Sequence, residues 1–399
     1  MDNYKHKLKG NILKNYIFIF LSRLDLTQGI WMIYLAVKGM TLTQLGLLEG
    51  IFHLVSFTME VPTGVVADLW GRRVSRIMGR GFAMVSMIVL MFSNSFFMFA
   101  VAFAILAISF NLESGAGEAL IYDSLKEIDL EDDYIKVNGK NEMFMQIASV
   151  VALLLGGYLA SKNYLYAFGF SAILAAITMG QAFLFVEPSI AIENKENKNQ
   201  NIFFSQIKDS LSVIRNNKKV GFLIVFINII ALSVTSLFYY LQNYWKVGGY
   251  SEFQIAIFLS ISSLLAGFMA TKVYKLEEVI KEKGIIAYMP FIIVLAMWGI
   301  ALTNCAPIFY ILIGVTESIV FVATSDYINK LIPSENRATI LSFQSMVFSL
   351  LMICVFPIIG KIGDSVSLNF AFKIMAILGT ILALVNAYMV LKVENKSIN

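Results

Sequence analysis

The chain alternates between long apolar runs and short polar stretches, and the length of the runs is its most informative feature. Each run holds about 20 apolar residues, enough for a helix to cross the ~30 Å hydrocarbon core of a bilayer. The runs lack the period-two alternation of barrel strands. The pattern predicts an all-α polytopic membrane protein with twelve transmembrane helices. The predicted spans are 12–37, 44–67, 74–93, 96–121, 142–161, 164–186, 219–245, 252–274, 284–304, 307–331, 338–360 and 368–392.

Composition strengthens this prediction. Of the 399 residues, 58% are hydrophobic and only 15% are charged, whereas soluble domains carry about 25% charged residues. The first run is not expected to be a cleaved signal, because it contains Arg23 and Asp25 and no small-residue cleavage site follows it.

Lysine and arginine are distributed unevenly between alternate connections of the predicted spans. Cytoplasmic connections carry an excess of these cations. If the N-terminus is cytoplasmic, the outer side holds few of them, namely Lys38, Lys162, Lys246 and Lys361. We therefore expect a protein of the cell membrane with both termini in the cytoplasm. Its formal net charge of +4 then requires no nucleic-acid partner.

The longest polar stretch, EPSIAIENKENKNQ, divides the spans into two groups of six. We expect an N-terminal half over 1–187, a cytoplasmic linker over 188–217 and a C-terminal half over 218–399. Apolar residues recur at helical spacing within the linker, beside several cations, which predicts an amphipathic helix on the inner leaflet. These apolar positions are Phe203, Phe204, Ile207, Leu211 and Ile214.

The stretch EVPTGVVADLWGRRVSR places a dense group of charges at the predicted cytoplasmic turn between spans two and three. Gly64, Asp68, Gly71, Arg72 and Arg73 stand there at G-x-x-x-D-x-x-G-R-R spacing. Gly71 permits a tight turn, and Gly64 is expected to allow close helix packing. Asp68 can accept hydrogen bonds from a helix N-terminus. The two arginines can clamp a carboxylate.

Asp123, at the cytoplasmic end of span four, is the expected partner of these arginines. The further cations Arg76 and Arg80 are explained by the positive-inside bias alone.

This loop resembles the signature of the major facilitator superfamily, and two groups of six spans agree with that resemblance. Leu69 departs from the family pattern, which usually has a cation there. The resemblance implies a secondary transporter that works by alternating access. It also implies that the loop residues with Asp123 latch the cytoplasmic side closed.

Ionisable residues inside the predicted spans are costly and therefore candidates for function. Glu49, His53, Ser56 and Glu60 recur at steps of four, three and four, which predicts one polar stripe along span two. The whole stripe favours a water-filled cavity over the alternative, in which His53 is simply a packed and hydrogen-bonded side chain.

Arg23 and Asp25, two residues apart, are expected on opposite sides of helix one, with Asp25 facing inward. Glu113 lies near mid-depth of span four, and Arg23 is one expected partner for it. Glu118 completes the group of candidates on that span.

Glu142 and Glu317 resemble, in position, titratable carboxylates of bacterial multidrug exporters in this superfamily. The antiporter motif that such exporters carry on span five survives here only as ASVVALLLGG, with Gly156 and Gly157 in place.

We expect export of amphipathic or cationic small molecules in exchange for protons. An uptake symporter of a small metabolite is the alternative. A membrane enzyme or a sensor is a third possibility, disfavoured because the chain has only two histidines.

No glycine-rich phosphate loop followed by lysine is present, so an ion gradient is the expected energy source. We expect no enzymatic activity, no cofactor, no metal site and a monomer in the lipid bilayer.

Overall fold

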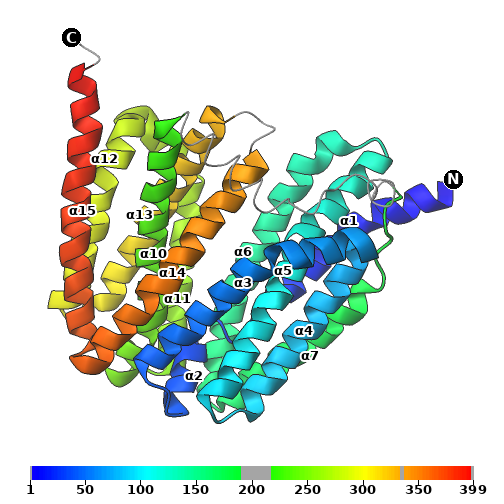
Figure 1. Ribbon diagram of the computed structural model, residues 1–399, viewed down its shortest axis with the longest axis horizontal. Helices are drawn as coiled ribbons and strands as arrows, with labels where there is room; N and C mark the ends of the chain where they lie inside the picture. Colours follow the sequence, from blue (N-terminus) through cyan, green and yellow to red (C-terminus); the bar gives the residue numbers. More distant parts are fainter. Residues whose placement is uncertain (1, 190–216, 333–336, 397–399) are drawn as a thin grey trace. The chain divides into compact units, whose positions relative to one another are not determined.

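The computed structural model describes residues 2–189, 217–332 and 337–396. They form helices and one 3-10 turn, which follow each other along the chain (Figure 1). Their bounds are α1 Asp2–Ser22, α2 Trp31–Val37, α3 Leu42–Trp70, α4 Arg72–Phe92, α5 Phe96–Glu127, η1 Glu131–Asp133, α6 Tyr134–Ala160, α7 Tyr164–Ala182, α10 Lys218–Val247, α11 Glu252–Ala270, α12 Val273–Leu302, α13 Ala306–Leu331, α14 Arg337–Ser365 and α15 Leu368–Lys396. The predicted amphipathic helix over 203–214 lies outside the described residues.

Eleven helices of the described chain are long and apolar enough to cross a membrane. They coincide with the second to twelfth predicted spans. The predicted fold class, an all-α polytopic membrane protein, is confirmed.

The first predicted span is not one continuous helix, which corrects the expectation for 12–37. Helix α1 ends at Ser22, the chain runs through turns from 23 to 30, and α2 then begins at Trp31. Arg23 and Asp25 therefore lie in the break, and the argument that placed them on opposite faces of a helix is wrong. Such discontinuous helices leave backbone polar groups available inside a membrane protein.

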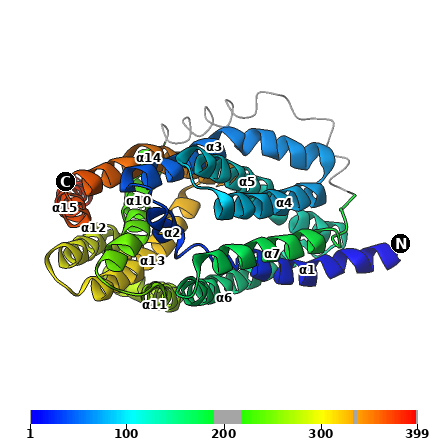
Figure 2. The ribbon, with the colours of Figure 1, turned by 90° about the horizontal axis from the view of Figure 1, so that it is seen from below.

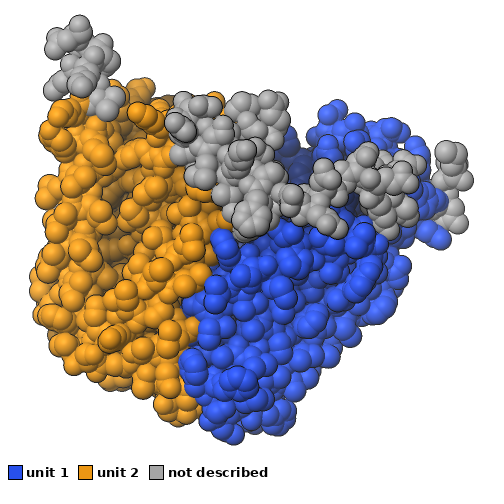
Figure 3. All heavy atoms as spheres, viewed as in Figure 1, with its two compact units in different colours: residues 1–34, 48–203 blue, residues 35–47, 204–399 orange. Residues whose placement is uncertain are grey.

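The chain forms two compact units, coloured separately in Figure 3. The first comprises 1–34 and 48–203, and the second comprises 35–47 and 204–399. The second unit thus includes the start of α3. The halves and linker drawn from the sequence remain predictions.

In the first unit, α4 packs between α5 and α7, and α1 packs against α5, α6 and α7 (Figure 2). Their facing sides carry apolar residues that exclude water from the centre of the unit. One buried cluster in this unit consists of Phe18, Leu120, Ile121, Leu125, Val137, Ala182 and Phe185.

In the second unit, α12 packs against α13 and α15, and α10 packs against α13 and α14. The start of α3 is held closely in this unit. The Asp364 carboxylate accepts hydrogen bonds from the backbone N–H groups of Leu42, at 2.9 Å, and Thr43, at 2.7 Å. A Cβ on Gly360 would lie 2.3 Å from the Leu42 carbonyl oxygen, so only glycine allows this approach.

Candidate functional site

A buried ion pair joins α4 and α5 inside the first unit. Arg76 Nε donates to Glu113 Oε1 at 3.1 Å. The Arg76 side chain is 1% exposed, whereas 24% of the Glu113 side chain remains exposed. Glu113 Oε2 is shielded and has no hydrogen-bond partner within the described part of the chain. The carboxylate therefore has one oxygen committed to the arginine and one that is uncommitted.

The surroundings of Arg76 compensate for its burial. Its guanidinium lies 3.9 Å from the ring centroid of Phe18 and 4.5 Å from that of Phe185, and aromatic faces attract such cations. Arg76 Nη1 also donates to Asn15 Oδ1 at 2.9 Å. Gly117 leaves room for the pair, since a Cβ there would lie 3.2 Å from Glu113 Oε1.

This arrangement corrects two expectations. Arg76 is not a loop cation explained by topology alone, because its charge is buried and paired. The ion-pair partner of Glu113 is Arg76 and not Arg23. Sequence reasoning counted Arg76 with the cytoplasmic loop, whereas helix α4 carries it inward by one turn.

Arg80 lies one further turn along α4 and is also an interior residue. Its Nε donates to Thr178 Oγ1 on α7 at 2.9 Å. Arg80 lies within electrostatic range of Glu113, Asp25, Arg23 and Arg76. A group of charges thus gathers in the first unit around the break in the first span.

The break itself is stabilised by specific polar contacts. Asp25 Oδ1 accepts from the backbone N–H and the hydroxyl of Thr27, at 3.0 and 2.6 Å. The Leu26 N–H donates to Ser171 Oγ at 3.2 Å. A Cβ on Gly156 would lie 2.1 Å from the Leu26 carbonyl oxygen. Gly156, noted in the sequence as a remnant of an antiporter motif, here accommodates the unwound backbone.

The polar stripe predicted on span two is present only in part. His53 Nε2 lies 3.6 Å from Glu49 Oε1, and both residues are buried. Ser56 exchanges hydrogen bonds with Asn111 of α5, at 2.7 and 2.6 Å. Glu60 is exposed. The first three positions thus have partners: Glu49 and His53 pair with each other within α3, and the partner of Ser56 lies on α5.

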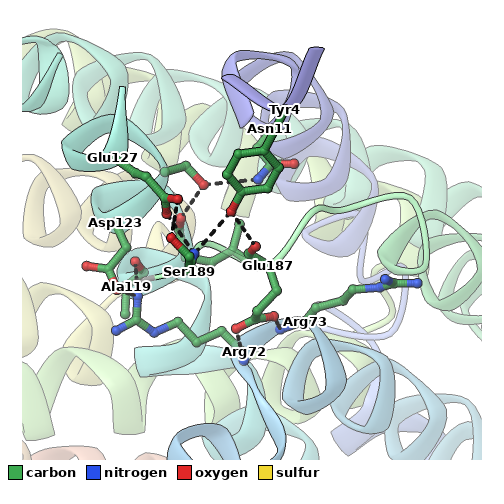
Figure 4. Close-up of polar contacts among 11 residues, drawn as sticks. Tyr4, Asn11, Arg72, Arg73, Ala119, Asp123, Glu127, Glu187 and Ser189 are labelled. Carbon is green, nitrogen blue, oxygen red and sulfur yellow. Dashed lines mark hydrogen bonds and ion pairs between the residues drawn. The ribbon is translucent and has the colours of Figure 1, made fainter. Parts of the chain in front are cut away.

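A second polar cluster surrounds the start of α4 (Figure 4). The carboxylate of Glu187 accepts from the backbone N–H groups of Arg72 and Arg73, at 2.7 and 2.8 Å. This places a negative charge at the positive end of a helix. The Arg72 guanidinium forms an ion pair with Asp123 and donates to the Ala119 carbonyl oxygen at 2.6 Å. The predicted Arg72–Asp123 contact is confirmed, and Glu187 is a participant that sequence reasoning missed.

Further contacts connect Glu187 to the N-terminus of the chain. The Tyr4 hydroxyl donates to the Glu187 carbonyl oxygen at 3.1 Å. Ser189 donates to the Glu127 carboxylate through its hydroxyl and also through its backbone N–H, which lies 2.7 Å from Glu127 Oε2. Burial, with the nearby Glu127 charge, raises the pKa of Tyr4, so its hydroxyl remains a donor.

The two glycines of the loop signature differ. Gly71 has φ +99°, a conformation that side chains disfavour, which confirms the tight turn. A Cβ on Gly64 would meet no atom within 4 Å in the described chain. The expectation of close packing at Gly64 is therefore wrong. Asp68 contributes to the electrostatic environment of Arg72.

The remaining candidate carboxylates on helices of the first unit, Glu118 and Glu142, are exposed. In the second unit Glu317 lies at mid-length of α13 and is half-buried. Within the described chain, no group of three or more His, Cys, Asp and Glu residues could hold a metal ion.

Comparisons with known proteins agree with this architecture. The chain is 24% identical over 357 residues to an uncharacterised MFS-type transporter, YxaM, of Bacillus subtilis (strain 168), covering 87% of this chain and 88% of that protein. Among solved structures, it resembles the nucleoside transporter NupG with a TM-score of 0.75 and 15% identity, over 97% of this chain and 99% of the other. It resembles a D-xylose-proton symporter with a TM-score of 0.70 and 13% identity, over 96% and 97% of the two chains.

A sequence model described as Major Facilitator Superfamily matches residues 16–308, most of the chain. The fold, the loop signature and this match lead to one conclusion: the chain belongs to the Major Facilitator Superfamily and is a transporter of small molecules in a lipid bilayer.

Proposed function

We propose that transport by this protein is coupled to protons through Glu113. The observation that carries the proposal is a carboxylate on a membrane-embedded helix with one oxygen paired to buried Arg76 and the other uncommitted. Intramembrane carboxylates of this kind form proton relays in transporters. The uncommitted oxygen is itself shielded, but the side chain is partly exposed, so that a small rearrangement would admit a proton to it.

Protonation of Glu113 changes the charge of the whole interior group. The charged side chains that act on Glu113 are Arg76 and Arg80 from α4 and Arg23 from the break. A neutral Glu113 leaves buried Arg76 without its counter-charge, which is strongly unfavourable unless the helices rearrange. The two protonation states therefore favour different packings of α4 and α5, as alternating access requires.

The direction of coupling has two candidates. Uptake symport is favoured by Arg76 and Arg80. Both are interior cations, although the sequence pattern alone had attributed them to the positive-inside bias. Export of amphipathic or cationic compounds in exchange for protons is supported by the exposed carboxylates of the first unit, Glu60, Glu118 and Glu142. We propose symport as the primary function, because the arginines lie at the same ion pair that would bind the proton.

The test uses de-energised cells in lightly buffered medium. Nucleosides, pentoses, monocarboxylates, organic phosphates and cationic dyes are added in turn, and the external pH is recorded. Symport of a substrate removes protons from the medium, whereas exchange for an entering compound releases them. Alkalinisation is expected, and acidification would establish the exporter instead.

The residue test compares two carboxylates of the first unit. Glu113→Gln should abolish the substrate-dependent pH change while substrate counterflow continues. Asp132→Asn, on the exposed turn η1, should alter neither. Persistent proton movement in Glu113→Gln would remove Glu113 from the coupling mechanism.

We also propose that the loop cluster acts as the cytoplasmic latch, through Asp68, Arg72 and Asp123, in a protein whose termini are cytoplasmic. Asp68→Asn should then stop transport while substrate binding persists. A cysteine at Lys162 should react with an impermeant thiol reagent from outside, and one at Lys281 should not. The reverse labelling would overturn this orientation.

A further inference from the structure

The group of charges around the break in the first span holds more positive than negative charge. Three arginines, Arg23, Arg76 and Arg80, share it with two carboxylates, Asp25 and Glu113. Arg76 and Glu113 satisfy each other as an ion pair. Arg23 and Arg80 are then left with one carboxylate between them, so one positive charge is unbalanced.

The hydrogen bonds of these two arginines are also incomplete. A guanidinium has five N–H donors, but toward the described residues Arg80 donates only from Nε, to Thr178. The Arg23 side chain is exposed and makes no hydrogen bond or ion pair with any residue that the structure describes. Asp25 directs one oxygen to the Thr27 turn. Both guanidinium groups therefore retain unused N–H donors beside the break, those of Arg80 on a largely enclosed side chain and those of Arg23 on an exposed one.

We propose that Arg23 and Arg80 form a binding site for an anionic group of the transported molecule, a carboxylate or a phosphate. Planar guanidinium groups bind both through paired N–H donors. An anion there balances the surplus charge and occupies the unused donors. The inference deepens the proposed function and, for transport, rests on it.

The position of the site explains how an anion and a proton would travel together. A proton on Glu113 cancels one of the two negative charges that compete with the anion for the arginines. Anion binding and Glu113 protonation then strengthen each other by the same factor, because linkage is reciprocal. The same charges oppose the binding of a cation.

The break in the first span supplies the required adaptability. Arg23 projects from a non-helical segment, whereas Arg80 is fixed on α4 by its contact with Thr178. Gly156 and Ser171 position the unwound backbone between α6 and α7. A small change in the turns from 23 to 30 can therefore bring one guanidinium toward the other without moving a whole helix.

The experiment measures binding to the full-length protein in nanodiscs, without any ion gradient. Four probes of matched shape are used: benzoate, phenyl phosphate, neutral benzamide and benzylammonium. Thermal stabilisation as a function of concentration gives an apparent Kd for each probe. Binding of either anion in preference to benzamide and benzylammonium supports the site, and their ratio tells a carboxylate site from a phosphate site.

Variants test which residues are responsible. Arg80→Gln and Arg23→Gln should each weaken anion binding by about tenfold or more. Arg80→Lys, which keeps the charge but loses the planar fork, should weaken it less. Asp25→Asn should strengthen binding severalfold, a gain that misfolding cannot imitate. Lys162→Gln, at an exposed lysine, is the matched control and should have no effect.

The outcomes separate this inference from the proton coupling. Anion binding that persists in a protein that moves no protons would refute the coupling and leave the site intact. Equal binding by Arg80→Gln and the unmodified protein, or tighter binding of benzylammonium than of both anions, would overturn the site.

Discussion

The two compact units differ in the kind of polar side chain that their interiors contain. The first gathers ionised side chains around one ion pair, Arg76–Glu113. Among the described residues of the second, Glu317 is the ionisable side chain at mid-length of a span. Buried Glu252, at the start of α11, pairs with Lys246 at 2.7 Å, and the other buried polar groups are neutral. They lie mainly on α10 and α11, at Asn228, Ser236, Gln242, Asn243, Ser260 and Ser262.

The difference extends to hydrogen bonding. Arg76 is surrounded by Glu113, Asn15 and two aromatic rings. In the second unit, the described structure offers no hydrogen-bond partner to several shielded atoms, namely Gln242 Oε1, Asn243 Nδ2, Trp245 Nε1 and Ser260 Oγ. Buried polar atoms without partners are rare and call for an explanation. Charge-dependent steps are therefore expected to depend on the first unit, and neutral hydrogen bonding to substrate on the second.

The largest effect is expected from breaking the ion pair of the first unit. Arg76→Met would leave Glu113 without its ion-pair partner, and removing one partner of a buried pair costs about 3–5 kcal/mol. The double variant Arg76→Met with Glu113→Gln should recover most of this loss, because no charge is then stranded. Unfolding of the purified protein in bicelles measures both.

The second unit supplies the matched comparison. Glu317→Gln should change stability by less than about 1 kcal/mol, because Glu317 has no ion-pair partner among the described residues. A loss at Glu317 as large as that at Arg76 would show that the two interiors do not differ in the way described.

A smaller effect is expected at two glycines, one in each unit. A Cβ on Gly156 would lie 2.1 Å from the Leu26 carbonyl oxygen, and one on Gly360 would lie 2.3 Å from that of Leu42. Alanine at either position must displace backbone, at a cost of roughly 1–3 kcal/mol. Gly180→Ala, with no atom within 4 Å, should be neutral or stabilising. Equal effects at all three positions would contradict the close approaches.

Much of the fold could be predicted from the sequence, because span length and hydrophobicity are local properties. Apolar runs marked eleven of the spanning helices, and the spacing of the loop signature marked the turn at Gly71. The break at 23–30 was missed, since its stabilising partners, Ser171 and Gly156, are far along the chain. The unusual presence of both Arg23 and Asp25 inside an apolar run was the available signal.

The candidate site was predictable only in part for the same reason. Asp123 could be matched to Arg72 because both adjoin turns that the sequence places on the same side of the membrane. The pairing of Arg76 with Glu113 depends on how α4 crosses α5, which hydrophobic periodicity does not determine. Glu187 was placed at the end of the N-terminal half with no partner assigned to it, although its carboxylate binds the start of a helix 115 residues earlier.

The smallest effects are expected at the carboxylate that caps a helix N-terminus in each unit. Glu187 binds the first N–H groups of α4 in one unit, and Asp364 binds those of α3 in the other. A helix cap of this kind contributes about 1 kcal/mol, so its loss should speed amide exchange in the adjacent turn by about fivefold. Glu187→Ala should accelerate exchange at the start of α4 and leave the start of α3 unchanged, and Asp364→Ala should do the reverse. Hydrogen exchange followed by mass spectrometry resolves the two peptides. If either variant accelerated exchange at both helices, the two caps would not be independent, and the units could not be treated as separately stabilised.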